Sequence, residues 1–303
     1  MRQLDFPQVG AEPQPVPPSL TKFAWLSIAA ALVTIGLKSG AYLLTGSVGL
    51  LSDAAESGVN LIAAVVALVA LHAAARPADE NHNFGHGKAE YFSAGIEGLM
   101  IFVAAAFILV TSVQRFMHPS ALESVGLGLA ISTLATVVNG AVGFLLLRAG
   151  AAHRSVTLTA DGKHLLTDVW TSAGVIVGVL LVALTGWERL DPIVAALVGL
   201  NILVTGFRLV SQSITSLLDA AMPAEDLARV SAVLERLRTA ETEFTDVRTR
   251  ESGRHRFISL TVLVPPDWTV ERGHTLADQV EVAIATDLPY TEVQTHIEPR
   301  PTP

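Results

Sequence analysis

The stretch Asp161-Gly-Lys-His164-Leu-Leu-Thr-Asp168 begins an apolar run that continues to Leu184. A run of about twenty apolar residues is long enough to cross a bilayer as one helix. Within it His164 and Asp168 are four residues apart, so both side chains project from the same face of a helix. Ionisable groups at membrane depth are costly and are rarely kept without a function. The stretch therefore predicts a transmembrane helix that carries a polar functional site.

A second stretch repeats this arrangement earlier in the chain. Asp53-Ala-Ala-Glu56-Ser-Gly-Val-Asn60 precedes an apolar run that continues to Leu71, and Glu56 and Asn60 are again four residues apart. If the two helices pack side by side, a four-ligand cluster forms from Glu56, Asn60, His164 and Asp168. Imidazole, amide and carboxylate groups together can replace the water shell of a divalent cation, and this ligand set suits Zn²⁺ or a similar ion.

Other polar residues in the apolar runs have simpler explanations. Asp53 and Asp161 lie near the expected starts of their helices, where an acidic side chain stabilises the helix dipole, so we favour capping or packing over metal binding for both. The remaining polar residues have no partner at matching spacing and are interpreted as interhelical hydrogen bonding or interfacial snorkelling. These residues are Lys38, Glu97, Gln114, Asn139 and Asn201.

The composition indicates an integral membrane protein with a soluble part. Of the 303 residues, 50% are hydrophobic and 16% are charged, and the mean hydropathy of +0.48 is too high for a soluble domain of this size. Charged residues are sparse between Thr21 and about Gly206 and dense after Ala224. The net charge of -8 argues against nucleic acid as a partner. Because the chain has no cysteine, any metal is held by nitrogen and oxygen ligands.

Six apolar runs are each long enough to cross a bilayer. They cover residues 23–44, 48–75, 90–117, 122–148, 160–185 and 190–210. Lys and Arg residues beside these runs gather on one side if the runs alternate in direction, which places both termini in the cytoplasm. Residues 1–20 are proline-rich and lack the apolar run of a signal peptide. We therefore expect a flexible tail at 1–20 and an all-α membrane domain of six transmembrane helices at 21–211.

The pattern changes from about Ser211. Periodicity predicts a helix at 223–238, strands at 244–250 and 256–264, a helix at 270–286 and a last strand at 291–298. In the second strand, alternate apolar residues fall on one face, namely Ile258, Leu260, Val262 and Val264. The order αββαβ predicts a small, ferredoxin-like α+β domain with both helices on one face of the sheet. This domain is expected to occupy residues 212–303 and to lie in the cytoplasm.

Two further groups of residues are candidate metal sites. Between the second and third apolar runs, Asp79, His82 and His86 are close enough to bind one cation, and neighbouring glycines let the backbone bend around it. The alternative is a solvated loop that happens to contain histidines. In the last predicted strand, His296 and Glu298 share one face, and His274 on the preceding helix completes a site if helix and strand meet there. The alternative is that all three are ordinary surface residues.

Four motifs, taken together, resemble the cation diffusion facilitator family over nearly the whole chain. Phe84-Gly-His86-Gly-Lys88-Ala-Glu90 is similar to the family signature after the second span, and His164-x-x-x-Asp168 is similar to its fifth-span motif. Asp246-Val-Arg-Thr-Arg-x-Ser-Gly253 and Ala277-Asp-Gln-Val-Glu281 resemble segments of its bacterial cytoplasmic domain. Each motif alone is modest support, but their order and spacing are highly specific.

The resemblance implies a homodimeric antiporter in the bacterial inner membrane that moves a divalent metal out of the cytoplasm in exchange for protons. It implies that the transport site falls on Glu56, Asn60, His164 and Asp168. It also implies a second site at Asp79, His82 and His86 and regulatory metal binding in the tail domain at His274, His296 and Glu298. The metal is then substrate and regulator, and no cofactor serves as a catalyst. The family's Lys–Asp contact near the dimer interface falls on Lys88 and Asp219.

The chain departs from the family pattern at two places. Members typically carry His or Asp, followed by Asp, in the second span, where Glu56 and Asn60 stand here. An amide in place of a carboxylate removes a charge and leaves the preferred metal open. In the tail of well-known relatives, two metals are held with extra histidines where Thr245 and Thr261 stand here. Tail binding is therefore expected to be weaker or mononuclear.

Three other functions fit the sequence less well. An intramembrane metal-dependent hydrolase is disfavoured because the chain lacks an HExxH pattern and no second carboxylate is placed as a general base. A passive channel is disfavoured because no filter-like run of backbone carbonyls is present. A membrane-anchored metal sensor would bind metal without carrying it. Histidine in the site favours Zn²⁺ as the substrate, whereas the oxygen-rich remainder leaves Fe²⁺, Mn²⁺ and Co²⁺ open.

Overall fold

The computed structural model describes residues 17–45, 48–118, 127–187 and 189–301. The chain divides into two compact units. Ser19–Leu218 form the first, which we call the membrane unit, and Asp219–Pro303 belong to the second, which we call the C-terminal unit. Each unit has its own hydrophobic core, so each is considered separately.

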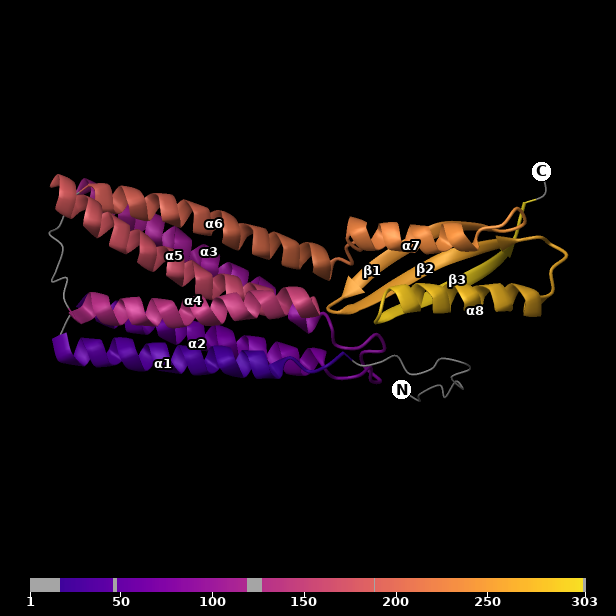
Figure 1. Cartoon of the computed structure of the whole chain (residues 1–303), viewed down its shortest axis with the longest axis horizontal. Helices are drawn as coiled ribbons and strands as arrows, with labels where there is room; N and C mark the ends of the chain where they lie inside the picture. Colours follow the sequence, from indigo (N-terminus) through magenta and orange to yellow (C-terminus); the bar gives the residue numbers. More distant parts are fainter. Residues whose placement is uncertain (1–16, 46–47, 119–126, 188, 302–303) are drawn as a thin grey trace. The chain divides into compact units, whose positions relative to one another are not determined.

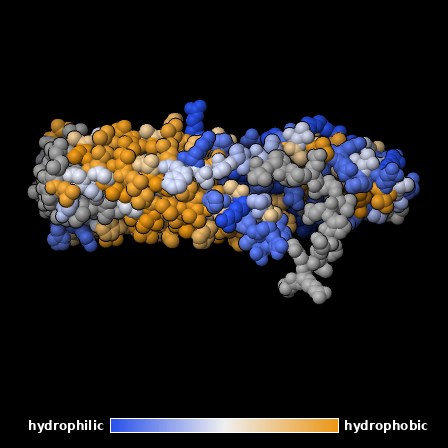
Figure 2. All heavy atoms as spheres, turned by 90° about the horizontal axis from the view of Figure 1, so that it is seen from below, coloured by the Kyte–Doolittle hydropathy of each residue, from blue (hydrophilic) through white to orange (hydrophobic). Residues whose placement is uncertain are grey.

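The described part of the membrane unit consists of six long helices (Figure 1). They are α1 (Thr21–Thr45), α2 (Val48–Ala74), α3 (Ala89–Met117), α4 (Leu127–His153), α5 (Val156–Thr185) and α6 (Leu190–Leu217). Among the described residues, five of these helices, all except α5, contain a stretch long and apolar enough to cross a membrane. Large apolar side chains such as Phe107 and Phe207 are 67% and 64% exposed. Hydrophobic residues accordingly dominate the surface of the unit in Figure 2, as expected of a protein surrounded by lipid.

Three helix boundaries differ clearly from the sequence prediction. Helix α4 continues to His153, past residue 148 where the apolar run ends. Helix α6 continues to Leu217, past residue 210, and in this extension the buried hydroxyl of Ser213 donates to the carbonyl of Tyr91 on α3 at 2.5 Å. Helix α5 begins at Val156 and is capped by Ser155, whose hydroxyl accepts from the Leu158 amide at 3.4 Å. Asp161 therefore lies in the second turn of α5 rather than at its cap, so of the two expected roles, capping or packing, its buried position agrees with packing.

The start of α5 is tied to the start of α3. Glu90 is buried, and its carboxylate accepts hydrogen bonds from the Ser155 hydroxyl and, at 3.5 Å, from the Thr157 amide. The Thr157 hydroxyl donates to the Glu90 carbonyl at 3.2 Å. A carboxylate at a helix N-terminus is stabilised by the helix dipole and satisfies amides that have no partner within the helix. These contacts fix where α5, which carries His164 and Asp168, begins relative to α3.

Helices α4 and α5 approach closely at a pair of glycines. A Cβ atom added at Gly162 would lie 2.9 Å from the Leu147 nitrogen and 3.0 Å from the Gly143 carbonyl oxygen. Only a residue without a side chain fits at such a distance, and small residues are typical of helix contacts within membranes. This contact holds α4 close to the part of α5 that carries Asp161 and His164, although Gly162 itself points to a different face of the helix.

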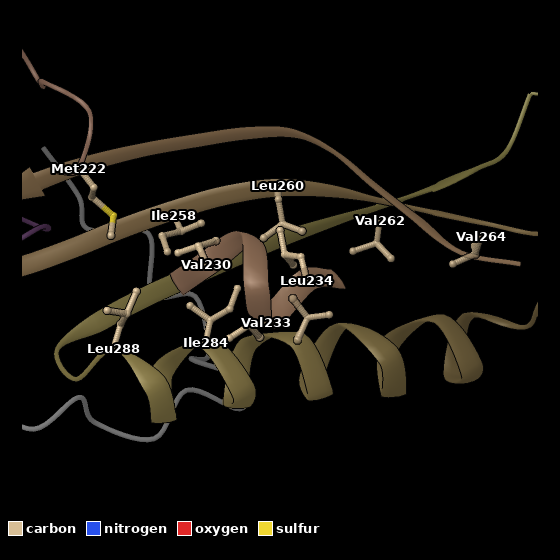
Figure 3. Packing of buried hydrophobic residues seen from close by; sticks show 11 residues of the cluster. Met222, Val230, Val233, Leu234, Ile258, Leu260, Val262, Val264, Ile284 and Leu288 are labelled. Atoms are coloured by element: carbon tan, nitrogen blue, oxygen red, sulfur yellow. The ribbon is translucent and has the colours of Figure 1, made fainter. Parts of the chain in front are cut away.

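The C-terminal unit contains α7 (Ala224–Leu237), β1 (Glu243–Ser252), β2 (His255–Val264), α8 (Val270–Asp287) and β3 (Thr291–Pro299). The sheet order is β1-β2-β3, with β1 antiparallel and β3 parallel to β2. Alternate β2 residues from Ile258 to Val264 are buried and share one core with Val230 of α7 and Ile284 of α8 (Figure 3). Both helices therefore cover the same face of the sheet, as the alternation in β2 predicts.

One ion pair is buried in the C-terminal unit. The Arg256 Nε donates to Asp226 Oδ2 at 3.2 Å, the side chains are 6% and 5% exposed, and Arg256 also donates to the Pro289 carbonyl at 2.8 Å. Replacing Asp226 by alanine leaves a buried guanidinium without this carboxylate, which is expected to cost about 3 kcal/mol. Hydrogen exchange of the β2 amides in the full-length protein measures the change.

The pair of Glu235 with Arg238 on α7 provides the control. Its N···O distance is also 3.2 Å, but the side chains are 68% and 49% exposed. Substitution of Glu235 by alanine is expected to change the protection of β2 by less than about 1 kcal/mol, because surface ion pairs contribute little. If the two substitutions lowered the hydrogen-exchange protection of β2 equally, the buried Arg256–Asp226 pair would contribute no more to stability than the exposed pair.

Candidate metal transport site

The polar residues predicted on the second and fifth helices meet inside the membrane unit. The Nε2 of His164 lies 2.9 Å from the side-chain oxygen of Asn60, and the amide nitrogen of Asn60 donates to Asp168 Oδ2. Asn60 and His164 are 4% and 5% exposed, and Asp168 is half-buried. Since the amide oxygen can only accept, His164 carries the proton of this bond on Nε2. The Asn60 amide thus links His164 and Asp168, which lie four residues apart on one face of α5.

A residue that the sequence analysis did not assign to the site also reaches Asp168. Asn139 on α4 is 3% exposed, and its side-chain nitrogen donates to Asp168 Oδ2 at 3.3 Å. The same carboxylate oxygen therefore accepts from amides on α2 and α4. Asn139 has no polar partner at helical spacing on α4, so its own helix gives no signal of this contact. The contact depends on the close approach of α4 and α5 at Gly143 and Gly162.

The other residues predicted near this site are placed differently. The side chains of Glu56 and Asp53 lie outside the described part of the structure, so their proposed roles stay predictions. Asp161 is 1% exposed and accepts a hydrogen bond at 3.1 Å from the hydroxyl of Ser27 on α1. It lies on α5 three residues before His164, which places it about one turn away on the same side of the helix.

This arrangement can exchange hydrogen bonds for metal bonds. The Asn60 oxygen, an Asp168 oxygen and the His164 nitrogen are all groups that coordinate borderline divalent cations. A cation bound to His164 through Nε2 requires that nitrogen to be free of a proton. A neutral ring meets this requirement by carrying its proton on Nδ1, so the hydrogen bond to the Asn60 oxygen is exchanged for a bond to the cation.

The loop between α2 and α3 brings Asp79, His82 and His86 together. One ligand atom from each lies within 4.8 Å of the others, and both His82 Nδ1 and His86 Nε2 are 3.3 Å from an Asp79 oxygen. The pKa of Asp79 is lowered, chiefly by the hydrogen bond from the His82 backbone amide; desolvation acts in the opposite direction, and the Asn81 amide and both imidazoles lower the pKa further. Gly85 adopts a φ of 75°, which lets the loop turn between the two histidines.

The residues predicted in the C-terminal unit form two separate pairs. His296 Nε2 lies 3.1 Å from Glu298 Oε1 on β3, whereas His274 Nδ1 lies 3.6 Å from Asp278 Oδ1 on α8. All four side chains are more than half exposed. Among the described residues, His274, His296 and Glu298 do not form a compact three-ligand group. The expected tail site stays a prediction, as does the contact of Lys88 with Asp219, which belong to different units.

Long apolar helices around a buried imidazole–amide–carboxylate cluster define a membrane protein with a polar site in its interior. Comparison with known families identifies the class more closely. Residues 24–218 match the cation efflux transmembrane domain, and residues 222–300 match the cytoplasmic domain of cation efflux proteins. The chain belongs to the cation efflux family, also called the cation diffusion facilitators, and its C-terminal match supports a homodimer that handles metal ions.

Individual relatives agree with this assignment. The chain is 50% identical over 277 residues to the uncharacterised transporter sll1263 of Synechocystis sp., covering 91% of this chain and 89% of the relative. It is 32% identical over 284 residues to the cation-efflux pump FieF of Klebsiella pneumoniae, covering 93% and 92%. A solved structure of CzrB, a candidate zinc transporter, has a sequence that is 34% identical to this chain. The match covers 26% of this chain and 99% of the CzrB chain, with a TM-score of 0.25. The relatives from Synechocystis sp. and Klebsiella pneumoniae are named as transporters rather than enzymes, which argues against the hydrolase alternative.

Proposed function

We propose that this protein exports a divalent metal, with Zn²⁺ as the main substrate, in exchange for protons. The proposed site consists of Asn60, His164 and Asp168 together with Glu56. The observation that carries the proposal is the convergence of His164 and Asp168 on Asn60 across two helices. Because these groups now satisfy one another by hydrogen bonds, a cation and a proton compete for the same atoms, as exchange transport requires.

In the proposed topology the chain crosses the bacterial inner membrane six times. Both termini and the C-terminal unit, which is proposed to be ferredoxin-like, then lie in the cytoplasm. The membrane unit has six helices among its described residues, and an even number of spans returns the chain to the side on which it began. The Asp79, His82 and His86 cluster would then face the cytoplasm, where it can bind metal before transport. Alternating access would release the metal outside as His164 and a carboxylate take up protons.

Zn²⁺ is favoured over other divalent ions because of the imidazole ligand. Zn²⁺ accepts one imidazole with oxygen ligands in a four-coordinate site, whereas Mg²⁺ and Mn²⁺ prefer oxygen ligands throughout. The amide at Asn60 also keeps the charge of the site lower than a carboxylate would. Fe²⁺ and Co²⁺ remain the alternative substrates, since each accepts the same mixed nitrogen and oxygen set.

A flux assay in sealed vesicles tests this function. The full-length protein is reconstituted and the uptake of Zn²⁺, Fe²⁺, Co²⁺ or Mn²⁺ is followed separately, each with and without a pH gradient. We expect Zn²⁺ to be carried fastest, with accumulation against its gradient only when a proton gradient drives it. Zn²⁺ movement that is unaffected by the pH gradient would contradict proton exchange and favour a passive channel, and binding without flux would favour a sensor.

A further inference from the structure

The amide of Asn139 is buried in the membrane unit and directed toward the proposed transport site. Asn139 on α4 is 3% exposed, and its side-chain nitrogen donates to Asp168 Oδ2 at 3.3 Å. Gly143 follows Asn139 by about one turn on the same face of α4. A Cβ atom added at Gly143 would lie 3.2 Å from the carbonyl oxygen of Gly162 on α5. The close contact between α4 and α5 therefore holds this amide beside Asp168.

The described residues satisfy only the nitrogen of this amide. The Oδ1 atom of Asn139 is buried and has no hydrogen-bond partner among them. Buried polar atoms in native proteins are almost always satisfied. Unlike a carboxylate, an amide oxygen does not take up a proton near neutral pH, so it needs a hydrogen-bond donor or a cation. Turning the amide over would only bring its oxygen against the Asp168 carboxylate.

Asn60 on α2 makes the same contact but differs in its oxygen. Both amides donate to Asp168 Oδ2 through their nitrogen atoms. The Asn60 oxygen lies 2.9 Å from His164 Nε2, whereas the Asn139 oxygen has no such partner in the described structure. A cation that binds Asn60 and His164 must replace the hydrogen bond between them. At Asn139 Oδ1 a cation replaces no hydrogen bond to a described residue, and amide oxygens are ordinary ligands of divalent cations.

We propose that Asn139 Oδ1 is a further ligand of the transported cation, contributed by α4 and placed beside Asp168. This inference rests on the transport site proposed above and adds a third helix to it. The new ligand is an uncharged oxygen that supplements the four ligands already proposed. Zn²⁺ is usually satisfied by four ligands, whereas Mn²⁺ prefers a larger set of oxygen atoms. Asn139 should therefore contribute more to the binding of Mn²⁺ than to that of Zn²⁺.

Flux in sealed vesicles, measured over a range of metal concentrations, tests the role of Asn139. Asn139→Leu keeps the approximate size of the side chain and removes both polar atoms. We expect it to raise the Mn²⁺ concentration at half-maximal flux by about 10-fold or more, and the Zn²⁺ concentration by less. Asn139→Asp keeps an oxygen but loses the donor to Asp168, and both values should stay at or below those of the wild type. Asn201→Leu makes the same change at an exposed position of α6 and should alter neither value.

The leucine and aspartate variants separate a metal ligand from a residue that only positions Asp168. If Asn139 acted only by donating to Asp168, both variants would raise the half-maximal concentrations of both metals alike, and the proposal would be overturned. Native values in Asn139→Leu would also overturn it. If Asn139→Leu does not elute as folded protein, Asn139→Asp alone decides between the two roles.

His164→Ala in the same assay tests the transport site itself. Native flux in His164→Ala would refute the proposed transport site. Loss of flux in His164→Ala, together with native half-maximal concentrations in Asn139→Leu, would refute only the role of Asn139.

The visible absorption of bound Co²⁺ distinguishes direct ligation from a contact through water. The spectrum of the full-length protein minus that of His164→Ala reports the transport site. Four-coordinate Co²⁺ absorbs more strongly than Co²⁺ with five or six ligands, so the intensity depends on the number of ligands. We expect Asn139→Leu to increase the absorption per bound ion, because it removes one ligand. An unchanged spectrum would mean that the Asn139 oxygen does not touch the cation, and would overturn the proposal.

Discussion

Replacing Asp168 by asparagine is expected to reduce metal flux through the reconstituted protein by about 100-fold or more. The substitution keeps the shape of the side chain and removes its charge. In the native structure one oxygen of Asp168 accepts hydrogen bonds from both Asn60 and Asn139. In the variant the amide oxygen can still accept from Asn60 and Asn139, but the other carboxylate oxygen is replaced by an NH2 group that cannot bind a cation. The site thus loses a negative charge and a metal-ligating oxygen while its hydrogen bonds can be kept.

The flux assay with Zn²⁺ under a fixed pH gradient measures this effect. Asp267→Asn is the matched control, because it makes the same chemical change at an exposed position in the C-terminal unit. Its flux should equal that of the wild type. If Asp168→Asn carried Zn²⁺ at more than about a tenth of the native rate, Asp168 would not be a ligand in transport. Equal retention times on size-exclusion chromatography would exclude misfolding as the cause of a loss.

Residues at helical spacing made the convergence of His164, Asp168 and Asn60 predictable from the sequence. His164 and Asp168 are separated by one turn, so any helix places them on one face, and the apolar run around them identifies the helix. The alternation of Ile258, Leu260, Val262 and Val264 likewise predicted the face of β2 that packs against α7 and α8. In both cases the signal is local, since it depends only on the repeat of the secondary structure.

Asn139 and Glu97 show what local patterns cannot reveal. Each is a single polar residue in an apolar helix, and both were interpreted as interhelical hydrogen bonding or snorkelling. Asn139 reaches Asp168 from a helix that is 29 residues away in sequence, and Glu97 interacts with Asp161 from a helix still more distant. Their partners are determined by how closely helices pack, and this depends on residues such as Gly143 and Gly162. Spacing within one helix carries no information about such contacts.

Asn60→Asp is expected to make the stability of the protein strongly dependent on metal. In the native site the Asn60 amide donates to Asp168, so the metal-free cluster is held by hydrogen bonds. In the variant two carboxylates face each other there, and the free energy of unfolding without metal should fall by about 1–3 kcal/mol. A bound divalent cation removes this repulsion and gains a charged ligand. Metal at about a hundredfold excess over its Kd should restore about 3 kcal/mol.

The substitution should also change which metal is carried. A third carboxylate, beside Asp168 and Glu56, makes the ligand set richer in charged oxygen, so flux of Mn²⁺ relative to Zn²⁺ should rise. Thermal unfolding in detergent, with and without each metal, measures the first effect, and competition between Zn²⁺ and Mn²⁺ in vesicles measures the second. Gln279→Glu adds the same charge at an exposed position of α8 in the C-terminal unit and serves as the control. An unchanged ratio of Mn²⁺ to Zn²⁺ flux would mean that Asn60 orders the empty site without selecting its substrate.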